Sequence, residues 1–177
     1  MRFIKMLLKC IFHWREKYAT EEEMKNVQAL IGFSFGGKEH SYCKSNKFLA
    51  NIASEILGKY NIPLITQWEL SELMWIKPIS IGKHRISGKY LDSYEVAKQA
   101  EEVLQKNNWK NVAILAHPDH AWRCAAILKK MGFNVVAINT SDCPYDSESN
   151  QKWTRNKWLF IPREILVRII YLLQEKI

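Results

Sequence analysis

The 177-residue sequence has few cysteines and no long apolar run. Its four cysteines, at positions 10, 43, 124 and 143, include no Cys-x-x-Cys pair, which argues against a structural zinc site. So few cysteines in a chain of this length also argue against an extracellular disulfide framework. No stretch approaches the roughly 20 apolar residues that span a bilayer, and no secretory signal is present. We therefore expect a cytoplasmic protein with reduced thiols.

The sequence also lacks internal repeats at a period of about 20–50 residues, which excludes a solenoid. It contains no Walker loop, His-Glu-x-x-His or EF-hand pattern. His117, Asp119 and His120 could ligate a metal together, but a histidine pair in a loop is more typical of hydrogen bonding, so we predict no metal site. Hydrophobic residues make up 47% of the chain and charged residues 25%, which is the composition of a globular domain with one core.

Acidic residues are fewer than basic ones, 18 against 26, which leaves a formal charge of +8. The excess lies in residues 1–60 and 121–177, whereas residues 61–120 are neutral. The basic residues are scattered, with Lys129-Lys130 as the only adjacent pair. Residues 152–158 interleave tryptophan with lysine and arginine, as in proteins that bind single-stranded nucleic acid. A solvated loop whose tryptophans pack at the core edge explains the same pattern, so nucleic acid is an unlikely partner.

Residues 1–24 are predicted to form a basic amphipathic helix and a linker. Arg2, Lys5, Lys9 and His13 share one helical face, and apolar residues cover the rest. We expect the apolar side to pack on the domain, which is the commoner use of this pattern. The alternative is that the helix lies on an anionic membrane surface, which would make the protein peripheral at the inner membrane face.

Residues 25–177 are predicted to form one α/β domain. Short apolar stretches at 27–35, 62–66, 112–116 and 135–138 are typical of buried strands. Helical patterns occupy 45–57, 92–105, 119–131 and 165–173, with Gly58 and Gly132 where helix caps belong. Residues 67–90 show no clear pattern. Strands that alternate with helices predict a Rossmann-like three-layer sandwich with a mainly parallel sheet.

Ligands of such sheets bind beyond the carboxyl ends of the strands. The glycine-rich turn after the first strand, Gln67 after the second, and residues 117–123 after the third should therefore converge. The turn contributes Gly32, Ser34, Gly36 and Gly37 as candidate ligand-binding residues, because its glycines let a backbone approach a phosphate or a ribose.

The segment 117–123 is the densest polar cluster of the chain. Proline at position 118 suits the first turn of a helix, so His120 and Arg123 lie one turn apart on one face. Arg123 and the helix N-terminus are suited to a phosphate or carboxylate, with His117 beside them. The alternative is that Arg123 pairs with a nearby acid. His120 is the candidate proton carrier, because its unperturbed pKa lies near neutrality.

Gly32-x-Ser34-x-Gly36 matches the nucleophile elbow of α/β hydrolases, which makes a serine hydrolase that uses Ser34 an alternative function. Asp92 and His120 could complete a triad. However, only about 30 residues precede Ser34, and the hydrolase fold needs strands and an oxyanion-hole loop ahead of its elbow.

The order of these motifs resembles a known family. A first strand ends in glycine at 29–32, a helix opens with Asp-Ser-Tyr-Glu-Val-Ala at 92–97, and a strand runs into His-x-x-Arg at 120–123. An apolar helix follows a proline-containing loop at 162–173. Over roughly residues 27–173 the chain thereby resembles the YdcF-like family, which includes the SanA and ElyC proteins. Asp-Ser stands at 92–93 where the family usually has Asn-Thr.

The resemblance implies a Rossmann-like sheet with a polar cleft where Gly32, Ser93, Glu95, His120 and Arg123 meet. Glu95 would accept hydrogen bonds from ligand hydroxyls. Several members of the family are linked to the bacterial envelope, and their activity is poorly defined. We expect a domain that binds a small anionic or nucleotide-like ligand, and whether it catalyses a reaction stays open.

Overall fold

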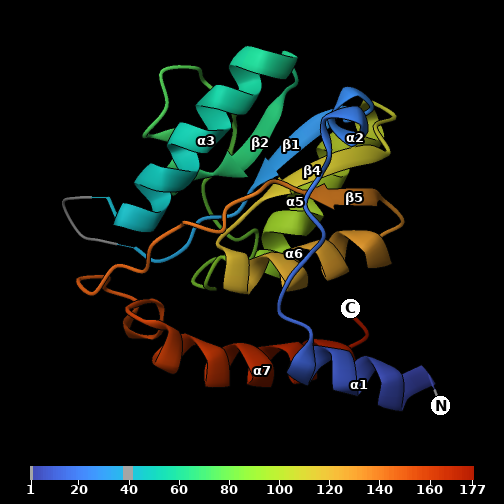
Figure 1. The fold of residues 1–177 in the computed structure, drawn as a ribbon, viewed down its shortest axis with the longest axis vertical. Helices are drawn as coiled ribbons and strands as arrows, with labels where there is room; N and C mark the ends of the chain where they lie inside the picture. Colours follow the sequence, from blue (N-terminus) through green and yellow to red (C-terminus); the bar gives the residue numbers. More distant parts are fainter. Residues whose placement is uncertain (1, 38–41) are drawn as a thin grey trace.

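The computed structural model describes residues 2–37 and 42–177, which fold around one parallel sheet (Figure 1). The five strands run in the order β3-β2-β1-β4-β5, and each pairs with its neighbour in parallel. Their bounds are β1 Ala29–Gly32, β2 Leu64–Gln67, β3 Ile79–Ile81, β4 Asn111–Leu115 and β5 Asn134–Ala137. The central strands β1, β2 and β4 are almost fully buried, as expected for strands covered on both faces.

Helices cover both faces of the sheet and complete a three-layer sandwich. The helices α5 (Ser93–Lys106) and α6 (Pro118–Lys130) pack on the face that carries Ile31 and Ile114. The helix α3 (Lys44–Tyr60) packs on the opposite face, which carries Leu30 and Leu115. The short helices α2 (Glu21–Lys25) and α4 (Trp68–Ser71) add to the second cluster. The predicted Rossmann-like three-layer fold is confirmed.

Two further helices lie together outside this sandwich (Figure 1). The first helix α1 (Arg2–Phe12) and the last helix α7 (Lys157–Leu173) run side by side in opposite directions. A single 3₁₀ turn, η1 (Lys152–Thr154), leads into α7. The prediction at 165–173 found only the second half of α7, which begins after the N-cap Asn156. Among the described residues, no helix is long and apolar enough to cross a membrane.

The segment 67–90, which showed no clear pattern, contains α4 and the edge strand β3. The strand has only three residues, and Ile79 and Ser80 are exposed, so no run of buried residues marks it. The apolar stretch 27–35 is longer than the strand within it, because β1 ends at Gly32. Phe33 and Phe35 are buried in the turn that follows instead.

Gly58 was predicted to cap a helix, and this prediction is wrong. The helix α3 continues through Gly58 to Tyr60, and Asn61 takes the left-handed cap conformation with φ 47°. Gly132 does have the expected positive φ, 90°, directly after α6. Both asparagine and glycine tolerate this conformation, so the pattern alone does not decide between Gly58 and Asn61.

The division of the chain that the sequence suggested at residue 24 falls inside α2. The N-terminal segment shares the core with the rest of the chain: Cys10 and Met24 are buried among residues of the sandwich. Tyr18 forms a parallel bridge with Ala137 on the outer strand β5. Residues 2–24 are therefore integral to the described fold.

Candidate functional site

A cleft of about 250 Å³ opens at the carboxyl ends of the strands. As expected for a parallel sheet, the turn after β1, the end of β2 and the start of α6 converge here. The helix α7 forms the wall opposite the sheet. The lining consists of residues 34–36, 67, 90–93, 120, 123, 151, 153 and 154, together with Phe160, Arg163, Val167, Ile170 and Tyr171 of α7.

Arg123 was expected to hold an anion, but the structure pairs it with a carboxylate of its own chain. Glu164 of α7 is fully buried and accepts hydrogen bonds from Arg123 Nε at 2.9 Å and from Nη2 at 2.8 Å. Burial alone would raise the pKa of Glu164, but the charge of Arg123 lowers it well below its usual range. The alternative interpretation of Arg123, pairing with an acid, is the one that the structure shows.

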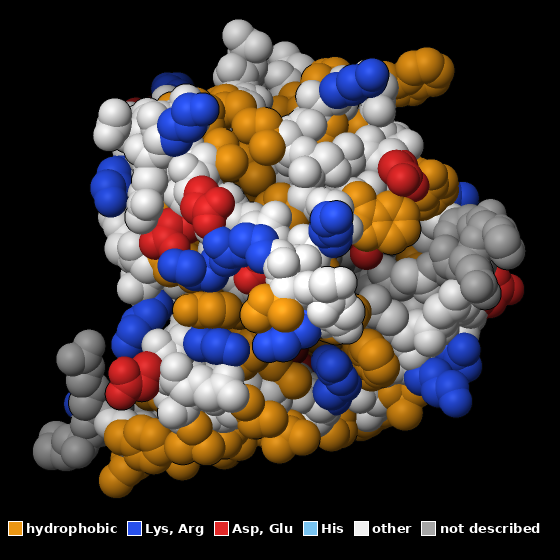
Figure 2. All heavy atoms as spheres, turned by 180° about the vertical axis from the view of Figure 1, so that it is seen from behind, with side chains coloured by type: hydrophobic (Ala, Val, Ile, Leu, Met, Phe, Trp, Pro, Cys, Tyr) orange, Lys and Arg blue, Asp and Glu red, His pale blue; other side chains and the backbone are white. Residues whose placement is uncertain are grey.

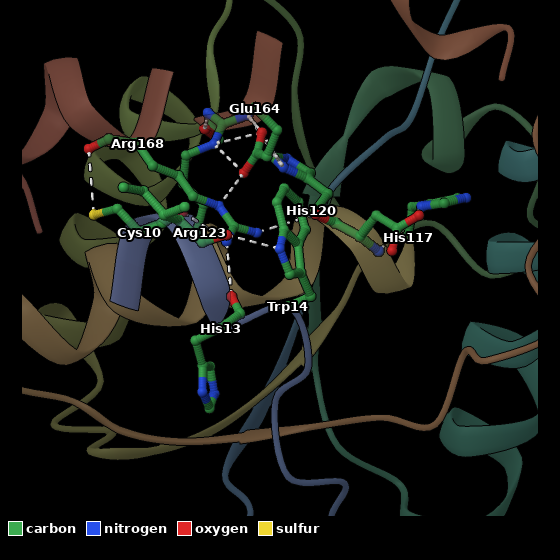
Figure 3. A network of polar contacts seen from close by, with 11 residues as sticks. Cys10, His13, Trp14, His117, His120, Arg123, Glu164 and Arg168 are labelled. Carbon is green, nitrogen blue, oxygen red and sulfur yellow. Dashed lines mark hydrogen bonds and ion pairs between the residues drawn. The ribbon is translucent and has the colours of Figure 1, made fainter. Parts of the chain in front are cut away.

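A second arginine shares the same carboxylate (Figure 3). Arg168 Nε donates to Glu164 Oε1 at 3.0 Å, and its Nη1 donates to the carbonyl of His13 at 2.8 Å. The Arg168 guanidinium is sandwiched between two rings, 4.2 Å from the Trp14 centroid and 4.6 Å from that of Trp122. The Glu164 carboxylate therefore joins α7 to α6 and faces two arginine charges, and Arg168 connects α7 to the end of α1 and to His13 after it.

His120 lines the cleft beside this network. Its Nδ1 lies 3.2 Å from Arg123 Nη2, and because a guanidinium only donates, Nδ1 accepts and Nε2 carries the hydrogen. Burial and the neighbouring Arg123 lower the pKa of His120 to about 4. The imidazole is therefore neutral near pH 7. The unperturbed pKa of histidine suggested that His120 carries protons near neutrality. This environment lowers its pKa below that range.

His117 does not reach the cleft. Its ring stacks on Phe35 with centroids 3.9 Å apart, and its Nδ1 accepts from the backbone N–H of Asp119. Burial lowers the pKa of His117 to about 3, and the nearby His120 adds to the shift. Its Nε2 is buried without a hydrogen-bond partner in the described structure. His117 therefore forms part of the aromatic packing beneath the cleft.

Ser34 lines the cleft, but its surroundings differ from a nucleophile elbow. Residues 33–37 are not helical, and α3 begins only at Lys44. The Ser34 hydroxyl contacts the carboxyl of Glu69, whose pKa is raised by burial. Asp92 caps α5 by accepting from the N–H of Glu95. No hydrogen bond between Ser34 and His120, or between Asp92 and His120, is found in the described structure.

The glycines of the turn have distinct roles. Gly32 passes against Thr66, where an added Cβ would lie 2.4 Å from the threonine Oγ1. Gly36 has φ 84°, and a Cβ there would come within 3.0 Å of the Ser149 and Thr154 hydroxyls. The carbonyl of Gly37 accepts from the N–H of Asn150 at 2.8 Å. Of these three glycines only Gly36 lines the cleft; close packing accounts for Gly32, and an added Cβ at Gly37 would make only an ordinary contact with Gln151.

Of the two site residues predicted in the Asp-Ser-Tyr-Glu segment, one lines the cleft and the other does not. Ser93 lines the cleft, and its Oγ accepts from Arg123 Nη1 at 2.5 Å. Glu95 points to a different partner: its carboxylate binds Arg85 Nε at 2.7 Å and Gln99 Nε2 at 2.8 Å. The hydrogen bond from Arg85 lowers the pKa of Glu95 to about 2. The structure does not place Glu95 in the lining.

The cation that faces the cleft without a carboxylate is Arg163. No ion pair joins Arg163 to an acidic side chain of the described residues; its guanidinium lies 4.2 Å from the Trp153 centroid. Burial, and next the charge of Arg123, lower its pKa. Sequence reasoning missed Arg163, Glu164 and Arg168. The sequence did contain a signal: Glu164 is the only acidic residue in an apolar helix and lies four residues before Arg168. A glutamate buried in such a helix needs a basic partner.

Of the nine predicted site residues, the cleft lining contains five: Ser34, Gly36, Ser93, His120 and Arg123. No group of three histidine, cysteine, aspartate or glutamate side chains in the described parts of the chain is arranged to hold a metal ion. Comparison of the chain with protein-family models, curated proteins and solved structures found no match.

Proposed function

We propose that this chain is a YdcF-like protein whose cleft binds a small anionic, nucleotide-like molecule. The anion site of this proposal is Arg163, which replaces the site expected at Arg123. The order of the sequence motifs and the Rossmann-like fold support the family. Among the residues that the structure describes, Arg163 has no carboxylate partner, and this observation supports an anionic ligand.

The electrostatics of the cleft wall favour an anion. Arg123 and Arg168 share Glu164, which can neutralise only one of them. Arg163 adds a further positive charge, and Asp92, the acidic residue in the lining, is engaged in capping α5. Partial burial and the neighbouring charge of Arg123 both disfavour the charged form of Arg163, and a bound anion would offset both effects. The planar guanidinium fork suits a phosphate or carboxylate.

The rest of the cleft suits an aromatic or apolar group. Trp153, Phe160 and Tyr171 contribute rings to the lining, and Gln67 and Gln151 contribute amides. A volume of about 250 Å³ lies just below the usual range of about 300–1,000 Å³ for ligand pockets. This size suits a mononucleotide-sized molecule or a smaller one rather than a dinucleotide.

The experiment compares ligand-induced thermal stabilisation of the wild-type chain with that of Arg163→Ala, using inorganic phosphate and nucleoside monophosphates as probes. We expect at least one probe to stabilise the wild type, by about 2.7 kcal/mol at a hundredfold excess over its Kd, and Arg163→Ala to lose this effect. Lys130→Ala is the charge-matched control, because Lys130 is exposed at the far end of α6.

Two results would contradict the proposal. One is an unchanged stabilisation of Arg163→Ala by a probe that binds the wild type. The other is an equal loss in Lys130→Ala, which would show that net charge alone governs binding.

A further inference from the structure

The surface built by α1 and α7 exposes large apolar side chains that nothing in the described structure covers. Figure 2 shows hydrophobic side chains in a band along the edge of the molecule that these helices occupy, with Lys and Arg beside it. We call this surface the α1–α7 face. It consists of Phe3, Ile4, Leu8 and Phe12 of α1 and of Trp158, Leu159, Leu166, Ile170 and Leu173 of α7, all at least 40% exposed.

The apolar residues are arranged as a stripe on each helix. In α1, Ile4, Leu8 and Phe12 recur every four residues, while Cys10 faces the core. In α7, Leu159, Leu166 and Leu173 recur every seven residues, which is two helical turns. The two antiparallel helices lie side by side in one layer of the molecule (Figure 1). Their apolar side chains form the band that Figure 2 shows.

Both helices carry lysines but no exposed carboxylate. Lys5 and Lys9 are exposed on α1, which contains no acidic residue, and Lys157 is exposed at the start of α7. The only acidic residue of α7 is Glu164, which is fully buried between Arg123 and Arg168. The exposed charged side chains of the two helices are therefore all basic, and the exposed Glu175 follows the end of α7.

We propose that the α1–α7 face docks on the surface of an anionic lipid bilayer. An apolar stripe with Trp, Phe and Leu beside lysines is the pattern of helices that lie in the membrane interface. The lysines would meet lipid phosphates, and the exposed Trp158 suits the level of the headgroups. The proposal takes up the alternative that the sequence left open for the first helix, contact with an anionic membrane, and extends it to a surface of two helices.

The same features argue against two other uses of the face. A symmetric contact between two copies of the chain would place Lys5, Lys9 and Lys157 of both copies in one interface, where like charges cost free energy. Insertion across the bilayer is excluded for α7, because its inner side holds the buried Glu164–Arg168 ion pair of the fold. Docking also does not rest on the proposed ligand, since none of its lysines lines the cleft.

The experiment is co-sedimentation of the full chain with phosphatidylcholine vesicles that contain phosphatidylserine, and with vesicles of phosphatidylcholine alone. We expect binding to the anionic vesicles that weakens as salt is added. The double variant Leu8→Glu/Leu166→Glu should lose it. Lys5→Gln/Lys9→Gln should bind about thirtyfold more weakly, since each cation near the surface contributes about a factor of five.

Trp75→Glu is the matched control, because Trp75 is fully exposed in the segment between α4 and β3, outside the face. It should bind vesicles like the wild type, and circular dichroism checks that all variants are folded. Absence of wild-type binding to anionic vesicles at low salt would overturn the proposal, as would an equal loss in Trp75→Glu. A wild-type dimer that Leu8→Glu/Leu166→Glu converts to monomer would instead assign the face to self-association.

Discussion

Glu164 and Arg123 form a buried ion pair that joins the last helix to the start of α6, 41 residues apart in the sequence. The two Oε atoms of Glu164 accept from Nε and Nη2 of Arg123 at distances of 2.8 to 3.1 Å. Both side chains are at most 7% exposed. The Glu164 carboxylate therefore occupies the position beside Arg123 where the sequence suggested a ligand anion. The proposed anion site is accordingly at Arg163.

Replacing Glu164 with Gln should destabilise the fold by about 3–5 kcal/mol, because two buried guanidinium groups lose their shared counter-charge. Glutamine has nearly the same shape, so packing changes contribute little. The free energy of unfolding in urea measures the effect. Glu22→Gln is the control: Glu22 pairs with Lys25 on the surface with its side chain 77% exposed, and its loss should cost no more than about 0.5 kcal/mol. Equal effects of the two substitutions would contradict a special role for the buried pair.

The sequence was sufficient to predict four of the five strands of the sheet, but not the partner of Arg123. Short apolar runs mark β1, β2 and β4 because these strands are buried on both faces. The edge strand β3 was missed because Ile79 is exposed and the strand has only three residues. Local spacing placed His120 and Arg123 on one helical face. It could not reveal that Glu164 folds back onto them, because that contact is set by tertiary packing.

The same tertiary contact sets the pKa values of the site, which local sequence does not determine. Histidine at position 120 was expected to titrate near neutrality, and burial beside Arg123 moves its pKa to about 4 instead. Glu95 was expected to face a ligand, and Arg85, ten residues earlier in the chain, binds it instead. Residue types at the carboxyl edge of a sheet therefore locate a cleft better than they assign roles within it.

Mild acid should destabilise the fold through His117 and His120. Their folded pKa values, about 3 and about 4, lie below the unfolded value of 6.5, so the unfolded chain binds more protons between these limits. Stability is therefore fully present above pH 6.5 and falls as the pH is lowered toward 4. Each histidine should cost about 2 kcal/mol between pH 6.5 and about pH 5. Urea unfolding across this window measures the slope.

The variant His120→Gln separates the histidines from the carboxylates. Glutamine does not titrate and can still accept a hydrogen bond from Arg123, so the slope in this window should fall by about half. Glu95 and Glu164, whose pKa values are lowered in the fold, change the stability mainly near and below the ordinary glutamate pKa of 4.5, where the unfolded chain takes up their protons. An unchanged slope in His120→Gln would show that His120 is accessible to protons in the folded chain.

Alanine at Gly58 and at Gly132 should change stability in opposite directions. Gly58 lies inside α3 with nothing within 4 Å of an added Cβ, so Ala should stabilise the fold by about 0.5–1 kcal/mol through helix propensity. Gly132 has φ 90° after α6, a conformation that Ala adopts only with strain, so Ala there should destabilise by about 1 kcal/mol. Urea denaturation of both variants measures the signs. Destabilisation by Gly58→Ala would mean that α3 ends at Gly58, as its sequence pattern suggested, rather than at Asn61.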